Sequence, residues 1–174
     1  FSFYAVLGIP GVPYPRTFAR AAGWSEATRA LGEVQDRIAR ETGARPVIVG
    51  MDKYNIASQV SFHGAGEGPA TGRPALRATT IRALSGSALM FSLWDPPEQF
   101  LGRTLILVAQ RPETLATERL SPQFGDLGPE IHELPLSASW PGGNGRAIDT
   151  YYYRIGRGYG GLSSHRQDAQ GSRN

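Results

Sequence analysis

The chain of 174 residues has the length of one ordinary domain, and its 40% of hydrophobic residues are enough to fill a single core. Its 22 glycines and 13 prolines lack the periodic excess of a collagen-like protein. The formal net charge is only +3, and most of that excess lies in residues 157–174, where three arginines accompany a single aspartate. Because a nucleic-acid-binding domain gathers many basic side chains on one face, this distribution argues against nucleic acid as a partner.

The composition also bears on membrane spans, disulfides and metal sites. No stretch reaches the length of a membrane-spanning helix, because the most apolar one, residues 1–14, is interrupted by Pro10 and Pro13. Cysteine is absent, which excludes disulfides and thiolate chemistry, and the three histidines stand far apart, so we expect no metal and no cofactor. Nearly all basic residues are arginine, which suits recognition of phosphate or carboxylate, but a coding bias toward arginine explains the same skew.

The two ends of the chain differ in character from its body. An uncharged apolar start followed by the Pro- and Gly-rich residues 8–15 is typical of the exit from a preceding hydrophobic segment. We therefore expect residues 1–14 to be a linker from a membrane segment and residues 15–159 to form one soluble α/β domain. Residues 160–174 are expected to be a disordered tail, since a Gly- and Ser-rich sequence buries too little surface.

In the first half of the body, hydrophobic periodicity predicts two helices around a buried strand. Apolar residues recur every three or four positions over residues 24–42, which predicts an amphipathic helix with Ser25 as N-cap and Gly43 as its stop. A continuous β-branched run at residues 46–50 predicts a strand buried on both faces. A second helix is expected over residues 52–62, where one helical face carries the larger side chains.

Strands and short helices alternate in the second half. The strongest strand pattern is the apolar run at residues 104–109, which we expect to be buried on both faces. Asp95 in front of two prolines predicts the capped start of a short helix over residues 95–101. The other expected elements are a Gly-rich loop at 64–74, a strand at 75–84, a helix at 112–120, strands at 130–137 and 147–155, and a turn at 139–145.

Helices that alternate with buried strands, followed by two adjacent strands, indicate an α/β fold. We expect a three-layer α/β/α sandwich with a mostly parallel central sheet and an antiparallel C-terminal edge pair. The sequence shows no internal repeat that would indicate a solenoid or a propeller.

Two Gly-rich segments, residues 64–68 and 156–161, resemble phosphate-binding loops. A dinucleotide-binding fingerprint directly follows a strand and opens a helix, whereas the first segment follows a helix and the second precedes the expected tail. We therefore expect both to be flexible connectors. The sequence has no Gly-x-Ser-x-Gly elbow, no Walker lysine and no paired His-Glu motif, which disfavours a stand-alone hydrolase or nucleotide-binding enzyme.

Two short segments carry the candidate binding residues. Asp52 and Tyr54 follow the buried strand at residues 46–50, and open α/β sheets bind ligands at the carboxyl ends of such strands. Trp94 and Asp95 together suit a sugar ring that stacks on an indole and hydrogen-bonds to a carboxylate. Each residue also has a purely structural explanation, since both aspartates stand where helix caps are expected and both aromatic rings could pack in the core.

Four motifs occur in order along the body: Gly23-Trp24, the helix start Tyr54-x-x-Ala57-Ser58, Trp94-Asp95, and Gly102 ahead of the strongest strand. In this order they resemble the soluble C-terminal domain of bacterial polyprenol-dependent membrane glycosyltransferases. These are the dolichyl-phosphate-mannose protein mannosyltransferase-like and aminoarabinose lipid A transferase-like enzymes. The resemblance spans roughly residues 14–159.

The resemblance implies a domain on the periplasmic face of the bacterial inner membrane, attached to the multi-pass transmembrane portion of the same polypeptide. In that family a sugar moves from a polyprenyl-phosphate donor to a lipid, glycan or protein acceptor by an inverting transfer. The acidic residue that acts as base belongs to a loop of the membrane portion. The resemblance therefore assigns no catalytic residue to this chain.

What the domain would contribute is a wall over the acceptor cleft. By position, the candidate substrate-binding residues are Asp52, Tyr54, Ser58, Trp94 and Asp95. The alternative is a self-contained periplasmic module that binds a glycan or a protein. A stand-alone soluble α/β enzyme is the third hypothesis, and the missing catalytic motifs make it the weakest.

Overall fold

The computed structural model describes residues 16–52, 54–71, 75–86, 90–137 and 147–161. The expected linker at residues 1–14, the turn at 139–145 and nearly all of the expected tail lie outside these ranges. No helix in the described part of the chain is long and apolar enough to cross a membrane. The strands are β1 (Val47–Gly50), β2 (Ala78–Thr79), β3 (Leu105–Ala109), β4 (Phe124–Leu127), β5 (His132–Ser137) and β6 (Ala147–Tyr159).

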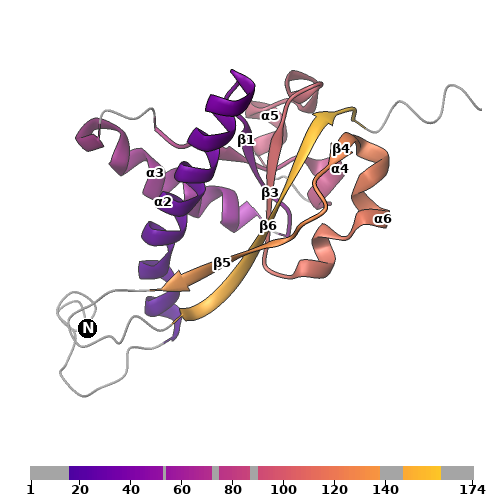
Figure 1. Cartoon of the computed structure of the whole chain (residues 1–174). Helices are drawn as coiled ribbons and strands as arrows, with labels where there is room; N and C mark the ends of the chain where they lie inside the picture. The colour runs from indigo at the N-terminus through magenta and orange to yellow at the C-terminus, as the bar shows by residue number, and fades with distance from the viewer. Residues whose placement is uncertain (1–15, 53, 72–74, 87–89, 138–146, 162–174) are drawn as a thin grey trace, which may run out of the picture.

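The six strands form one mixed sheet in the order β2-β1-β3-β6-β4, with β5 also paired to β6 (Figure 1). β1 pairs in parallel with β2 and β3, whereas β6 runs antiparallel to β3, β4 and β5. The expected α/β fold, with a mostly parallel core and an antiparallel edge, is confirmed. The helical segments are α2 (Arg16–Thr42), α3 (Tyr54–Thr71), α4 (Arg82–Ser85), α5 (Phe91–Trp94), the 3-10 helix η1 (Pro97–Phe100), η2 (Pro112–Leu115), α6 (Thr117–Leu120) and η3 (Ser121–Gln123).

Successive side chains of the central strands point to opposite sides of the sheet, so the sheet has two apolar faces. Helices cover both of them. Ile48, Ile106 and Val108 belong to the core under α2 and α3. Their neighbours Val49 and Leu107 belong to the second core, which α4, η1, η2 and α6 close with Leu84, Phe100, Leu115 and Leu120. The double burial explains why β1 and β3 read as continuous apolar runs, and both strands were predicted correctly.

α2 begins at Arg16, eight residues before the predicted start, because the Ala- and Arg-rich residues ahead of Trp24 are good helix formers. Ser25 therefore lies inside the helix and does not cap it. Gly43 ends the helix as predicted: its φ is 72° and its N–H donates to the Ala39 carbonyl at 2.9 Å.

α3 runs from Tyr54 to Thr71, so the predicted loop over residues 64–74 is wrong for most of its length. Gly64 lies where α3 packs against Leu76, and a Cβ at this position would stand 2.4 Å from the Leu76 Cβ. The glycine permits a close approach rather than flexibility, which a propensity argument does not detect.

The predicted strand over residues 75–84 is also wrong, except for two residues that do form a strand. Only Ala78–Thr79 pairs with β1, and the chain then turns into α4, which carries Leu84 into the second core. The predicted helix over 112–120 is divided into η2 and α6 by the extended Ala116.

β6 is longer than predicted, because its last residues pair with β4, a strand that the sequence pattern did not reveal. The segment expected to be a connector at residues 156–161 is therefore strand up to Tyr159. Gly156 is needed there because a Cβ would lie 2.5 Å from the ring of Phe124. The strand predicted at residues 130–137 is confirmed, with Leu134 and Leu136 buried in alternation.

Candidate functional site

Asp52 stands at the carboxyl end of β1, where the sequence predicted a ligand site. After β1 the chain enters α3, which packs on one face of the sheet, and after β3 it enters η2, which packs on the other face. In α/β sheets, such neighbouring strands with connections on opposite faces open a crevice between their carboxyl ends. Here the Asp52 carboxylate is bound within the protein: it accepts hydrogen bonds from the Gln110 N–H and from the Thr114 hydroxyl. These bonds hold β1 to the segment after β3.

The two other predicted residues near this edge belong to α3. Tyr54 is the first residue of the helix, and its side chain lies outside the described set. Ser58 is exposed one turn further along. The structure therefore brings Asp52 and Tyr54 to the same edge of the sheet.

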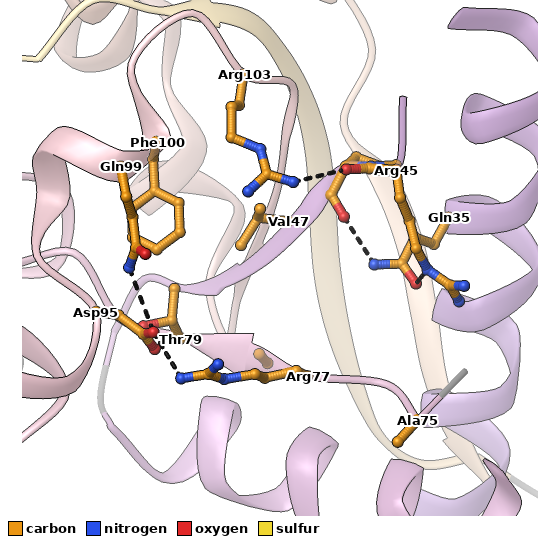
Figure 2. A pocket seen from close by; sticks show the side chains of 12 residues that line it. Gln35, Arg45, Val47, Ala75, Arg77, Thr79, Asp95, Gln99, Phe100 and Arg103 are labelled. Atoms are coloured by element: carbon orange, nitrogen blue, oxygen red, sulfur yellow. Dashed lines mark hydrogen bonds and ion pairs between the residues drawn. The ribbon is translucent and has the colours of Figure 1, made fainter. Parts of the chain in front are cut away.

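Asp95 lies apart from these three residues and lines a cleft of about 220 Å³ by the amino ends of the parallel strands (Figure 2). Asp95 is 7% exposed, whereas Trp94, one residue before it, is 63% exposed and is not among the residues that line the cleft. Asp95 is not the N-cap of the helix that follows it, because the residue in front of η1 is Pro96; it stands instead at the C-cap of α5. The cleft is lined by the polar residues Gln35, Arg45, Arg77, Thr79, Asp95, Gln99 and Arg103 and by the apolar residues Pro46, Val47, Ala75, Ala78 and Phe100.

Three arginines meet at the cleft because each one precedes a parallel strand. Arg45 stands two residues before β1, Arg77 directly before β2 and Arg103 two residues before β3. Parallel strands begin at the same edge of a sheet, so this placement brings the three side chains together. Figure 2 shows Arg103 and Arg77 on opposite sides of the cleft, with Val47 between them.

Hydrogen bonds hold two sides of the cleft in place. Asp95 Oδ1 accepts from Arg77 Nη2 at 2.7 Å and from Gln99 Nε2 at 3.3 Å (Figure 2). On the opposite side, Arg45 Nε donates to Gln35 Oε1 at 2.6 Å. Both arginines are therefore oriented before any ligand arrives.

Arg103 differs from the other two arginines in its partners. Arg77 is paired with Asp95, and Arg45 Nη2 lies 3.2 Å from the carboxylate of Asp36. Arg103 donates only to the backbone carbonyl of Arg45, at 3.2 Å, and no carboxylate of the described residues forms an ion pair with it. Among the described residues, the cleft thus holds one guanidinium group that has no carboxylate partner.

A buried hydroxyl adds to the polar lining. Thr79 is 2% exposed, and its Oγ1 has no hydrogen-bond partner within the described part of the chain. Its oxygen has almost no accessible surface, so the groups of the cleft suited to holding a polar or anionic ligand are the arginines and the amides.

Sequence reasoning missed Arg45, Arg77, Arg103 and Gln99 because it searched the carboxyl ends of the strands. A signal was present, however, since an arginine occurs within two positions before each of the three parallel strands. The arginine skew of the whole chain concealed it.

Ser25 and His63 form a second polar contact, between α2 and α3. The Ser25 Oγ lies 3.0 Å from His63 Nδ1, and burial lowers the pKa of His63 from its ordinary value of 6.5. Within the described ranges, no carboxylate hydrogen-bonds to the other ring nitrogen, so the pair lacks the third member of a catalytic triad. Neither residue lines the cleft.

Comparisons of the chain with protein-family models, with curated proteins and with solved structures gave no match.

Proposed function

We propose that this chain is the extracytoplasmic domain of a bacterial polyprenol-dependent membrane glycosyltransferase. It belongs on the periplasmic face of the inner membrane, attached to the transmembrane portion of the same polypeptide. The parent enzyme transfers a sugar from a polyprenyl-phosphate donor to a lipid, glycan or protein acceptor. The domain is non-catalytic and helps to place the acceptor.

The observation that carries this proposal is an exposed tryptophan beside a buried carboxylate at the cleft. The Trp94 ring is 63% exposed and stands edge-on to Phe91, with 5.8 Å between ring centroids. Next to it, Asp95 orients the side chains of Arg77 and Gln99. A sugar ring can place its C–H face on an exposed indole while its hydroxyls bond to such polar groups.

The motifs behind the sequence resemblance support the proposal by their position. Trp94-Asp95 is one of them, and its aspartate lines the cleft. Gly102 is another: its φ of 73° turns the chain, and its N–H donates to the Tyr159 carbonyl at 2.8 Å. The next residue is Arg103, so the glycine helps to set where that guanidinium stands.

The test is sugar transfer by the full-length parent enzyme carrying Trp94→Ala. Because the ring is mostly exposed, folding is retained, and we expect KM for the acceptor to rise several-fold with a smaller change in kcat. Phe62→Ala is the matched control, since Phe62 is an aromatic residue that is 76% exposed on α3 and neither it nor its chain neighbours line the cleft. Equal transfer by the Trp94 variant and the wild type would contradict a role in acceptor placement.

The alternative is a self-contained glycan- or protein-binding module, and the coding sequence upstream of Phe1 separates the two. Several apolar segments of about 20 residues support the membrane enzyme. A coding sequence without them, together with saturable glycan binding by the chain alone, would replace the proposal with the binding module.

A further inference from the structure

We infer that the cleft at the amino ends of β1, β2 and β3 binds a phosphoryl group carried by a larger molecule, with Arg103 as its main contact. The inference deepens the proposed function, on which it rests for its biological setting, by naming the chemical group that the cleft takes. Three observations carry it: the guanidinium without a carboxylate partner, the directions of the donors and the size of the cleft.

Arg103 supplies the charge that an anion would meet first. Arg103 is exposed, and its guanidinium donates one N–H to the Arg45 carbonyl at 3.2 Å. The other N–H groups of the planar guanidinium are available to a ligand. Arg77 and Arg45 each have a carboxylate neighbour, at 2.7 Å and 3.2 Å respectively. The two paired arginines shape the cleft, and the third gives it a net attraction for negative charge.

The directions of the donors favour a tetrahedral anion over a planar one. Figure 2 shows Arg103 and Arg77 on opposite sides of the cleft and Gln99 on a third. A carboxylate has two coplanar oxygens and is satisfied by a single guanidinium fork, whereas a phosphoryl group offers three oxygens pointing in different directions. Donors that approach from several sides therefore match the phosphoryl group.

The cleft is larger than the phosphoryl group alone requires. Its volume is about 220 Å³, which corresponds to the liquid volume of roughly seven waters. Val47, Ala75 and Phe100 supply an apolar wall beside the polar groups. This space suits the first carbons of whatever carries the phosphate, either a soluble phosphate ester or the headgroup of a lipid.

The experiment is a titration of the 174-residue chain with inorganic phosphate, sulfate, glycerol phosphate and acetate, followed by calorimetry or by NMR shifts of the arginine side chains. We expect saturable binding of phosphate, sulfate and glycerol phosphate, with glycerol phosphate the tightest and acetate weaker by tenfold or more. Acetate binding as tight as phosphate would overturn the phosphoryl assignment. Failure of all four anions to bind would overturn the site.

Arg103→Ala should weaken phosphate binding by roughly tenfold or more, as expected for the loss of charge-assisted hydrogen bonds. Arg111→Ala is the matched control, since Arg111 is an exposed arginine two residues after the other end of β3. Thermal melts of both variants show whether the fold is intact; Arg103 anchors only a backbone carbonyl, so we expect unchanged melting. Equal loss of binding in both variants would mean nonspecific attraction and would overturn the proposal.

Vesicles distinguish the two sources of the phosphoryl group. Phosphatidylcholine vesicles containing phosphatidic acid should bind the chain through Arg103 if a lipid headgroup is the ligand, whereas binding of glycerol phosphate without vesicle binding identifies a soluble ester.

The transfer assay of the parent enzyme separates this inference from the proposed function. Phosphate binding with transfer unaffected by Trp94→Ala leaves the phosphoryl site standing without the acceptor role, and the reverse result leaves the acceptor role without the phosphoryl site.

Discussion

The Thr114 hydroxyl donates a hydrogen bond of 2.7 Å to a carboxylate oxygen of Asp52, joining the carboxyl end of β1 to the 3-10 helix that follows β3. The second oxygen of the same carboxylate accepts from the Gln110 N–H. Asp52 thus links the ends of two parallel strands through its own side chain. The ligand-binding cleft inferred above lies at the opposite edge of these strands.

Replacing Asp52 by Ala should therefore lower stability and leave phosphate binding unchanged. The variant loses both hydrogen bonds, and we expect the free energy of unfolding in urea to fall by roughly 2 to 3 kcal/mol. Thr114→Val removes one of the two bonds, and the double variant should show a coupling of roughly 1 to 2 kcal/mol. Strictly additive effects would contradict the direct bond.

Arg154 is a buried cation that binds the last residue of η2 and the residue after β4. It is 3% exposed, and its guanidinium donates to the carbonyls of Gly128 at 2.6 Å and Leu115 at 2.7 Å. Arg154→Ala leaves both carbonyls unpaired, so we expect a loss of roughly 3 kcal/mol or more in urea unfolding. Arg157→Ala, on the same strand, removes only an exposed ion pair with Asp126 and should cost less than about 1 kcal/mol. Similar losses in both variants would show that Arg154 is not a structural anchor.

Gly64→Ala tests the close packing of α3. Within a helix this change usually stabilises by about 1 kcal/mol, but here the new Cβ would meet the Leu76 Cβ at 2.4 Å and its carbonyl oxygen at 2.9 Å. We expect the opposite sign, a loss of roughly 1 to 3 kcal/mol measured by thermal or urea unfolding. Gly125→Ala is the control, because its Cβ would meet only ordinary contacts at 3.7 Å and beyond. A stabilised Gly64 variant would refute the packing seen around Leu76.

His63 should make stability depend on pH. Burial lowers the pKa of His63 in the folded chain below its ordinary value of 6.5, so the unfolded state binds more protons over the interval between the two values. The free energy of unfolding should therefore decrease as the pH falls from 6.5 toward the folded pKa, and the His63 contribution should be fully present above 6.5. Urea unfolding across this range should show a shallower pH dependence for His63→Gln than for the wild type. Identical slopes would mean that His63 titrates alike in both states.

The sequence predicted the central strands well for a physical reason. β1 and β3 are buried on both faces, so nearly every side chain must be apolar and the pattern is readable in one dimension. The end of α2 was equally readable, because Gly43 adopts a positive φ that a local rule anticipates. Short elements were not readable from the sequence, because β2 depends on its pairing with β1 and β4 depends on its pairing with β6.

The candidate site was predicted only in part. Trp94 and Asp95 were singled out, and Asp95 lines the cleft, but Asp52 and Tyr54 lie at the other edge of the sheet. Whether any of these residues binds substrate stays a prediction. The role of Gly64 was misread, because a glycine in a loop and a glycine in a close contact look alike in a sequence.

By itself, the sequence determined the α/β class and the two core strands, since these depend on hydrophobic periodicity along the chain. Only the tertiary structure decided which polar residues meet. Arg45, Arg77 and Arg103 are separated by 32 and 26 positions, and they share a cleft because β1, β2 and β3 start at one edge of a parallel sheet. Asp52 lies away from that cleft for the same reason: it follows the carboxyl end of β1, whereas Arg45 precedes the amino end, and the two ends of a strand lie at opposite edges of the sheet.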